Sequence, residues 1–231
     1  MCSTCPARPS PPGPGYPPCM PESAATTPLL TGRFQRAFTL ASELHGDQVR
    51  KGTTVPYLAH LMSVAALVLE HGGAEDAAIG GLLHDSIEDS ADGAQTEARI
   101  RREFGGRIAE IVAGCSDAVA VPGQDKPPWR ERKEAYIARL AADGDPDVLL
   151  VSACDKLHNA RAIVADLRAL GPAVWDRFSQ PDPAGHLWYY ESLAACYRGR
   201  VPDRLADELG RVLADMRTLA HPPETAALAA G

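Results

Sequence analysis

Four side chains that can bind a metal or carry a proton lie within six residues of one another in the stretch GLLHDSIEDS. They are His84, Asp85, Glu88 and Asp89, and they follow apolar residues with helical spacing. Burying such groups beside isoleucine and leucine is costly unless something offsets their charge. A bound metal ion is the simplest partner, so this stretch predicts a metal site.

The apolar spacing around this stretch predicts a helix over residues 75–89. At about 100° per residue, the four polar side chains project from this helix within one arc of about 140°. The residues that remain to anchor the helix in the core are Ile79, Leu82, Leu83 and Ile87. One helix would therefore present two metal ligands and, one turn later, two carboxylates.

Two further polar residues stand at the centres of apolar helical patterns. His60 lies in PYLAHLMSVA and Asp155 lies in LLVSACDKLHNAR, where a group that must stay solvated is unusual. With His84 and Asp85 they supply two nitrogen and two oxygen ligands. Such a set suits a divalent ion such as manganese, iron, cobalt or zinc. The set has no thiolate, which disfavours a structural cysteine-type zinc site.

Each ligand also has a purely structural alternative. An HD dipeptide is common, so by itself it is weak evidence for a metal site. His60 by itself could be a histidine that packs in the core or at an interface. Asp155 by itself could cap a helix or form an ion pair with Lys156 or Arg161. The metal interpretation depends on the conjunction, because three separate helices each contribute an otherwise unexplained polar residue.

Glu88 and Asp89 acquire a role once the metal site is granted. They lie one turn beyond the ligands, where a hydrolytic water would be. A metal lowers the pKa of that water toward neutrality, and a nearby carboxylate can orient it or accept its proton. The alternative for both carboxylates is a solvated helix end.

The composition bounds the class of protein. The 231 residues, 45% hydrophobic and 23% charged, are enough for one domain with a substantial core. The net charge of −7 argues against nucleic acid as the main partner. No apolar run is long enough to span a membrane, and the first residues do not resemble a signal peptide. We therefore expect a cytoplasmic protein with no membrane partner.

The six cysteines do not indicate disulfides. Cys115, Cys154 and Cys196 lie in apolar helical patterns, which is typical of small buried side chains. The CSTC motif near the N-terminus has no second pair of cysteines or histidines with spacing suitable for zinc.

The remaining elements are predicted to be helical almost throughout. Helices are expected between Thr31 and Gly46 and over residues 58–71, 75–89, 96–106, 107–118, 129–142, 146–169, 183–198 and 203–220. No stretch alternates long enough to form a sheet, so the fold class is all-α, a single compact bundle.

The two ends of the chain are expected to lie outside this bundle. Residues 1–28 hold nine of the 20 prolines and almost no aliphatic side chains, which predicts a disordered tail. We expect the domain over residues 29–221 and a flexible tail over residues 222–231. Met20 is an alternative start, because folded-looking sequence follows soon after it.

Four segments resemble the HD-domain metal-dependent phosphohydrolases. The likeness is greatest to the hydrolase domain of RelA/SpoT-type proteins and to small stand-alone alarmone hydrolases. The segments are ELHGDQVRKGTTVPYLAHLMSVA, GLLHDSIEDS, FGGRIAEIVAGCSD and CDKLHNAR, in the family's order over residues 33–165. The HDxxED pattern is the most specific, because many other HD hydrolases lack the Glu–Asp pair. The family fold is an HD-domain helical bundle, which agrees with the periodicity.

The resemblance implies a metal centre at the same residues. His60, His84, Asp85 and Asp155 match the family's metal ligands, for which the usual ion is manganese(II), Mn²⁺.

The resemblance also implies roles around that centre. Glu88 and Asp89 match the pair that activates the hydrolytic water. Arg50 and Lys51 match a basic pair that lies against the nucleotide, and Asn159 matches a substrate-contacting asparagine. The implied reaction removes pyrophosphate from the 3′ position of ppGpp or pppGpp. The chain is too short for a following synthetase domain, so we expect hydrolysis only.

Some departures from the family pattern leave alternatives for the function. Ser152 and Cys154 stand where the family typically has lysine and alanine. The first alternative is an HD phosphohydrolase that acts on another nucleotide or dinucleotide phosphate. The second is a non-catalytic nucleotide-binding regulatory module, which would keep the basic residues but damage the metal set.

Further residues offer weaker candidates for substrate contacts. Arg130, Arg132 and Lys133 either reach a phosphate from the rim of the site or form a solvated helix start. The aromatic residues of LWYY, 187–190, are expected to pack in the core, with Tyr189 the best candidate for stacking on a base.

Overall fold

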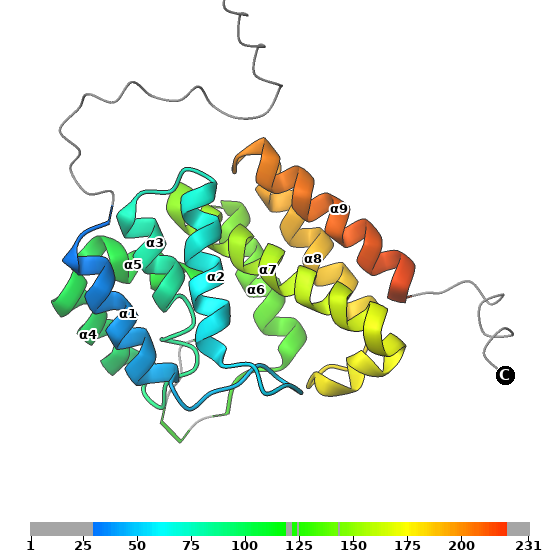
Figure 1. Ribbon diagram of the computed structural model, residues 1–231, viewed down its shortest axis with the longest axis horizontal. Coiled ribbons are helices and arrows are strands. Elements are labelled where there is room, and N and C mark those ends of the chain that lie inside the picture. Colours follow the sequence, from blue (N-terminus) through cyan, green and yellow to red (C-terminus); the bar gives the residue numbers. More distant parts are fainter. Residues whose placement is uncertain (1–29, 119–121, 124, 143, 221–231) are drawn as a thin grey trace, which may run out of the picture.

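The computed structural model describes residues 30–118, 122–123, 125–142 and 144–220. Within these residues all regular structure is helical, which confirms the predicted all-α fold (Figure 1). Extended pairing there is limited to an isolated antiparallel bridge between Val49 and Pro56. The predicted tails, residues 1–28 and 222–231, lie outside the described residues, as do Met20 and the CSTC motif.

The helices follow the predicted ranges within a few residues, except at the end of α3. Their bounds are α1 (Gly32–His45), α2 (Tyr57–Glu70), α3 (Glu75–Leu83), α4 (Gly93–Phe104), α5 (Gly106–Cys115), α6 (Trp129–Ala142), α7 (Pro146–Leu170), η1 (Gly171–Arg177), α8 (Pro183–Tyr197) and α9 (Asp203–Ala220). The short 3₁₀ helix η1 was not predicted. α4 begins earlier than expected because the side chain of Asp92 accepts a hydrogen bond from the backbone N–H of Gln95.

The long helix α7 runs through the centre of the bundle and packs against α2, α3, α5, α8, α9 and η1 (Figure 1). Its start is fixed by Asp145, whose carboxylate accepts hydrogen bonds from the backbone N–H groups of Asp147 and Val148. Its end is fixed by Gly171, whose φ of +68° suits glycine. Because 13 of its 25 residues are buried, the mid-helix residue Asp155 is held inside the protein.

The apolar core has two parts that share helix α2. One part surrounds α7, α8 and α9, and α2 contributes Val64 and Val68 to it. The other surrounds α1, α3 and α5, and α2 contributes Leu61 and Ala65 to it. His60 therefore lies on the helix that joins the two parts. No helix among the described residues has both the length and the apolar content needed to cross a lipid bilayer.

The predicted helix over residues 75–89 is wrong in its second half. α3 ends at Leu83, residues 84–88 form turns, and residues 89–90 form a bend. The backbone N–H of Ser86 donates to the carbonyl of Leu83, three residues back, while its side chain lies 3.3 Å from Nε2 of buried His45. Ile87 is fully buried. These contacts fix a turn, and the polar side chains that follow α3 owe their positions to it rather than to helical spacing.

Gly81 sets the distance between α2 and α3. A Cβ atom at this position would lie 3.2 Å from the backbone Cα of Ala65, so the two helices approach closely there. We expect Gly81→Ala to separate them and to lower the free energy of unfolding by about 1–3 kcal/mol. Chemical denaturation measures this change.

Gly210→Ala is the matched control for that substitution. Gly210 also lies inside a helix, but a Cβ atom there would meet nothing within 4 Å. Alanine should therefore stabilise this position by roughly 0.5–1 kcal/mol, because it restricts the unfolded chain and favours helix. Equal effects of the two substitutions would contradict the close approach at Gly81.

Candidate metal centre

Three of the four predicted ligands, His60, His84 and Asp155, come together from α2, the turn after α3, and α7. Ligand atoms of His60, His84 and Asp155 all lie within 4.8 Å of one another. His60 Nε2 lies 3.2 Å from Asp155 Oδ1. The Oδ2 atom of Asp85 lies 3.0 Å from His84 Nε2 and 3.7 Å from His60 Nε2. Asp85 lies outside this group of three, but its carboxylate stands beside both imidazole nitrogens.

The two histidines fit a metal ion by their hydrogen bonding. Among the described residues, the Nε2 atoms of His60 and His84 are buried and form no hydrogen bond of suitable geometry, although carboxylate oxygens lie 3.0–3.2 Å away; this is rare for buried polar atoms. The other nitrogen of His84, Nδ1, donates to the carbonyl of Gly81 at 2.9 Å. His60 Nδ1 lies 2.8 Å from Nδ1 of His158. A proton fixed on Nδ1 leaves the Nε2 lone pair available to a metal.

His158 is suited to hold His60 in that tautomer. Burial and the neighbouring His60 and Arg50 lower the pKa of His158 to about 4, which favours a neutral His158 whose Nδ1 can accept the proton of His60. We expect His158→Ala to weaken metal affinity by roughly 10- to 100-fold. Titration calorimetry with Mn²⁺ measures the effect. His71→Ala, at the end of α2, is the control, and equal affinities in the two variants would contradict this role.

The two carboxylates are held by neighbouring donors. Tyr57 Oη donates to Asp85 Oδ2 at 2.6 Å. Asp155 accepts hydrogen bonds from Asn159 Nδ2 at 2.6 Å and from Lys156 Nζ. Burial opposes the ionisation of Asp155, but the adjacent Lys156 ammonium holds its pKa well below the usual range. A charged carboxylate at this depth is a suitable ligand for a cation.

Glu88 and Asp89 line the pocket into which the ligands face. Glu88 accepts hydrogen bonds from Lys126 Nζ at 3.2 Å and from the backbone N–H of Asp117 at 3.5 Å. Burial and the charge of Asp117 raise the pKa of Glu88. Burial and the charges of Asp85 and Glu88 raise the pKa of Asp89 to about 6. Carboxylates with raised pKa values accept protons more readily near neutral pH than solvated ones do.

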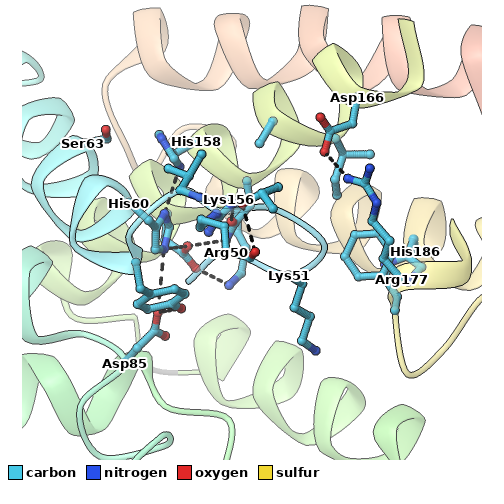
Figure 2. A pocket seen from close by; sticks show the side chains of 18 of the residues that line it. Arg50, Lys51, His60, Ser63, Asp85, Lys156, His158, Asp166, Arg177 and His186 are labelled. Atoms are coloured by element: carbon cyan, nitrogen blue, oxygen red, sulfur yellow. Dashed lines mark hydrogen bonds and ion pairs between the residues drawn. The ribbon is translucent and has the colours of Figure 1, made fainter. Parts of the chain in front are cut away.

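The centre opens into a pocket of about 840 Å³, large enough for a nucleotide. Its basic lining residues are Arg50, Lys51, Lys133, Lys156 and Arg177. In Figure 2, Asp85 and Arg177 lie on opposite sides of the pocket, and Lys51 projects into the open space between them. Five acidic residues, Asp85, Glu88, Asp89, Asp155 and Asp166, also line the pocket, so a bound divalent cation would give the lining the positive excess that favours an anionic ligand.

The predicted substrate-binding residues lie together at this pocket. Arg50 Nη2 donates to Asn159 Oδ1 at 2.8 Å, which links the loop before α2 to α7. The backbone of that loop is closed by a hydrogen bond from Arg50 N to Val55 O at 2.9 Å. Gly52, at φ +70°, makes the tight turn within it. Lys51, next to this turn, lines the pocket and is exposed.

The weaker candidates divide between the pocket and the surface. Lys133 lines the pocket and forms an ion pair with Asp117. The guanidinium group of Arg130 instead lies over the ring of Trp188. Tyr189 is 5% exposed, as expected for a core residue, but it also lines the pocket.

Several residues of the centre were missed by sequence reasoning. Tyr57 and His158 each lie three residues from a predicted ligand on the same helix, so helical spacing from His60 and Asp155 could have found them. The link from Lys126 to Glu88 spans 38 residues and gives no local signal.

The comparisons with known proteins agree with this arrangement. The model of the HD domain matches residues 37–181, more than half of the chain. The chain belongs to the HD-domain family. The match contains all four candidate ligands and the Glu88–Asp89 pair, so the resemblance noted in the sequence is confirmed.

Individual relatives place this HD domain near SpoT-type proteins. A guanosine-3′,5′-bis(diphosphate) 3′-pyrophosphohydrolase of Aquifex aeolicus is 34% identical over 136 residues, 59% of this chain and 18% of that protein. One of the same name from Haemophilus influenzae is 33% identical over 129 residues, 54% of this chain and 18% of that protein. The chain thus spans about a fifth of the length of these relatives.

A solved structure supports the fold of the HD domain. It is described as a metazoan ortholog of SpoT that hydrolyses ppGpp, and it has a TM-score of 0.65 at 23% sequence identity. The alignment covers 84% of this chain and 99% of that one.

Proposed function

We propose that this HD domain is a Mn²⁺-dependent phosphohydrolase that removes the 3′-pyrophosphate from ppGpp or pppGpp. The observation that carries the proposal is the pair of buried Nε2 atoms of His60 and His84, which form no hydrogen bond of suitable geometry among the described residues. They face two carboxylates beside a pocket lined with basic residues. The names of the relatives supply the choice of nucleotide.

His60, His84, Asp85 and Asp155 would hold the ion. A divalent ion held there would supply Lewis acidity and would lower the pKa of water. Asp155 has the most constrained side chain of the four, because Lys156 and Asn159 already donate hydrogen bonds to its carboxylate. These donors fix the direction in which its carboxylate faces the ligand set.

The protein's own residues would carry the remaining steps. Glu88 and Asp89 orient the attacking water and accept its proton, a role that their raised pKa values favour. Arg50 and Lys51 offset the negative charge that develops on the phosphate. Asn159, which accepts a hydrogen bond from Arg50, keeps this basic loop against the metal side of the pocket.

A substrate screen tests this function. The full chain, freed of metal and reloaded with Mn²⁺, should release pyrophosphate from ppGpp, and chelation should abolish the release. We expect the highest kcat/KM for ppGpp in a panel that includes dinucleotide phosphates and nucleoside monophosphates. Preference for another member of the panel would support the alternative nucleotide hydrolase. Binding of ppGpp without turnover in any metal would support a regulatory module.

A further inference from the structure

An ion pair stands in the pocket away from the metal ligands. Arg177, at the end of η1, donates from Nη1 to Oδ2 of Asp166 on α7 at 2.9 Å. Both residues line the pocket, and their side chains are 23% and 39% exposed. Figure 2 shows the pair on the opposite side from His60 and Asp85. The hydrolytic mechanism leaves this pair without a role.

The pair lies on the same stripe of α7 as the metal ligand. Asp155, Asn159, Ala162 and Asp166 all line the pocket, and at about 100° per residue they fall within an arc of about 60°. Asp166 stands 11 residues beyond Asp155, a rise of about 16 Å. An extended nucleotide bound by its phosphates at the metal end would therefore point its base along this stripe. The small side chain of Ala162 leaves room for it.

The surroundings of the pair suit a flat aromatic ligand. Ile163, Val174, Phe178 and His186 line the same part of the pocket. The rings of Phe178 and His186 lie with centroids 4.7 Å apart. Such apolar and aromatic walls, with a few fixed polar groups, are typical of sites that bind a nucleotide base.

Arg177 is held in place from the other side by the loop before α2, which carries Arg50 and Lys51. A Cβ atom on Gly52 would lie 2.6 Å from Cδ of Arg177, so the loop backbone packs directly on the arginine stem. The guanidinium group is thus fixed between this loop and Asp166. Among the described residues, Asp166 Oδ1 accepts no hydrogen bond, which leaves it available to a ligand.

We propose that Asp166 and Arg177 bind the Watson–Crick edge of a guanine base and determine the base specificity of the site. Guanine presents two donors, the N1–H and the 2-amino group, which match the free Oδ1 and the second lone pair of Oδ2. Arg177, on the Oδ2 side, then lies beside the 6-carbonyl oxygen. Adenine offers an acceptor at N1 and a donor at position 6, so it mismatches both residues. This inference rests on the proposed function, because it places the phosphates at the metal end.

Asp166→Asn provides the test, because it replaces one of the two acceptor oxygens of the carboxylate by an N–H donor. An asparagine side chain offers one acceptor and one donor, which match the N1–H and the 2-carbonyl oxygen of xanthine. We expect the Mn²⁺-loaded wild type to bind GDP at least roughly tenfold more tightly than xanthosine diphosphate. In Asp166→Asn this preference should invert. Titration calorimetry measures both dissociation constants, and inosine diphosphate, which lacks the 2-amino group, should lose its disadvantage in the variant.

Asp215→Asn is the matched control, since Asp215 forms an exposed ion pair with Arg168 outside the pocket. It should leave the ratio of dissociation constants unchanged. Comparing two ligands within one protein separates specificity from any general loss of folding. An unchanged ratio in Asp166→Asn, or a wild type that does not distinguish the bases, overturns the inference.

The two proposals can fail separately. A wild type that releases pyrophosphate from ppGpp, with the ratio unchanged in Asp166→Asn, retains the proposed function and loses the base assignment. A wild type with the expected ratios that cleaves no 3′-pyrophosphate retains the base assignment and loses the proposed function.

Discussion

Asp85→Asn is expected to empty the metal centre and to reduce the rate of pyrophosphate release on the order of a thousandfold. The carboxylate of Asp85 lies within 3.7 Å of both histidine Nε2 atoms, and an amide replaces its charge with a weak neutral ligand. A metal ion contributes several kcal/mol to stabilising the charge of a transition state, and each 1.4 kcal/mol is about tenfold in rate. The side chain keeps its size, so the hydrogen bond from Tyr57 has an acceptor in the variant.

Metal binding by this variant can be measured without activity. The wild type should melt at a higher temperature with Mn²⁺, since a ligand at 100 times its Kd stabilises the folded state by about 2.7 kcal/mol. Asp85→Asn should show no such rise and should contain little metal after dialysis. Asp92→Asn is the control, because asparagine caps a helix as well as aspartate does. An Asp85→Asn protein that retains the ion and the melting shift would contradict the assignment.

The fold was largely predictable because its helices carry local signals. Thr31 and Asp182 cap α1 and α8 by accepting hydrogen bonds from nearby backbone N–H groups, and both residue types are readable in a sequence. The end of α3 was not predictable in this way. Apolar periodicity continues through Ile87, whereas the turn depends on the contact of Ser86 with His45, 41 residues earlier in the chain.

The candidate site was predictable in part because its ligands are unusual for their surroundings. A histidine or aspartate at the centre of an apolar helix stands out, and His60 and Asp155 do so. The residues that support them resemble ordinary polar residues in the sequence. The ion pair of Arg177 with Asp166 and its contact with Gly52 depend on how η1 packs, and η1 has no strong periodicity of its own.

Replacing Glu88 by Gln, or Asp89 by Asn, is expected to reduce kcat by roughly 10²- to 10⁴-fold while the metal content stays that of the wild type. Among the described residues the histidines pair with Asp85 and Asp155 and not with Glu88 or Asp89, so the ion should remain bound. Both side chains line the pocket, where the amides can still orient water but cannot accept its proton. Retention of metal distinguishes these variants from Asp85→Asn.

The pH dependence of the two variants should differ. The negative charge of Glu88 contributes to the raised pKa of Asp89, together with burial and Asp85. Glu88→Gln removes that charge, so the pKa of Asp89 should fall and the acid limb of the residual kcat profile should move to lower pH. Asp89→Asn should remove the group that titrates in that limb. Steady-state rates between pH 5 and pH 8 at saturating Mn²⁺, about the range in which a carboxylate of raised pKa titrates, measure both effects. An unchanged rate in both variants, with metal bound, would contradict their role as proton acceptors.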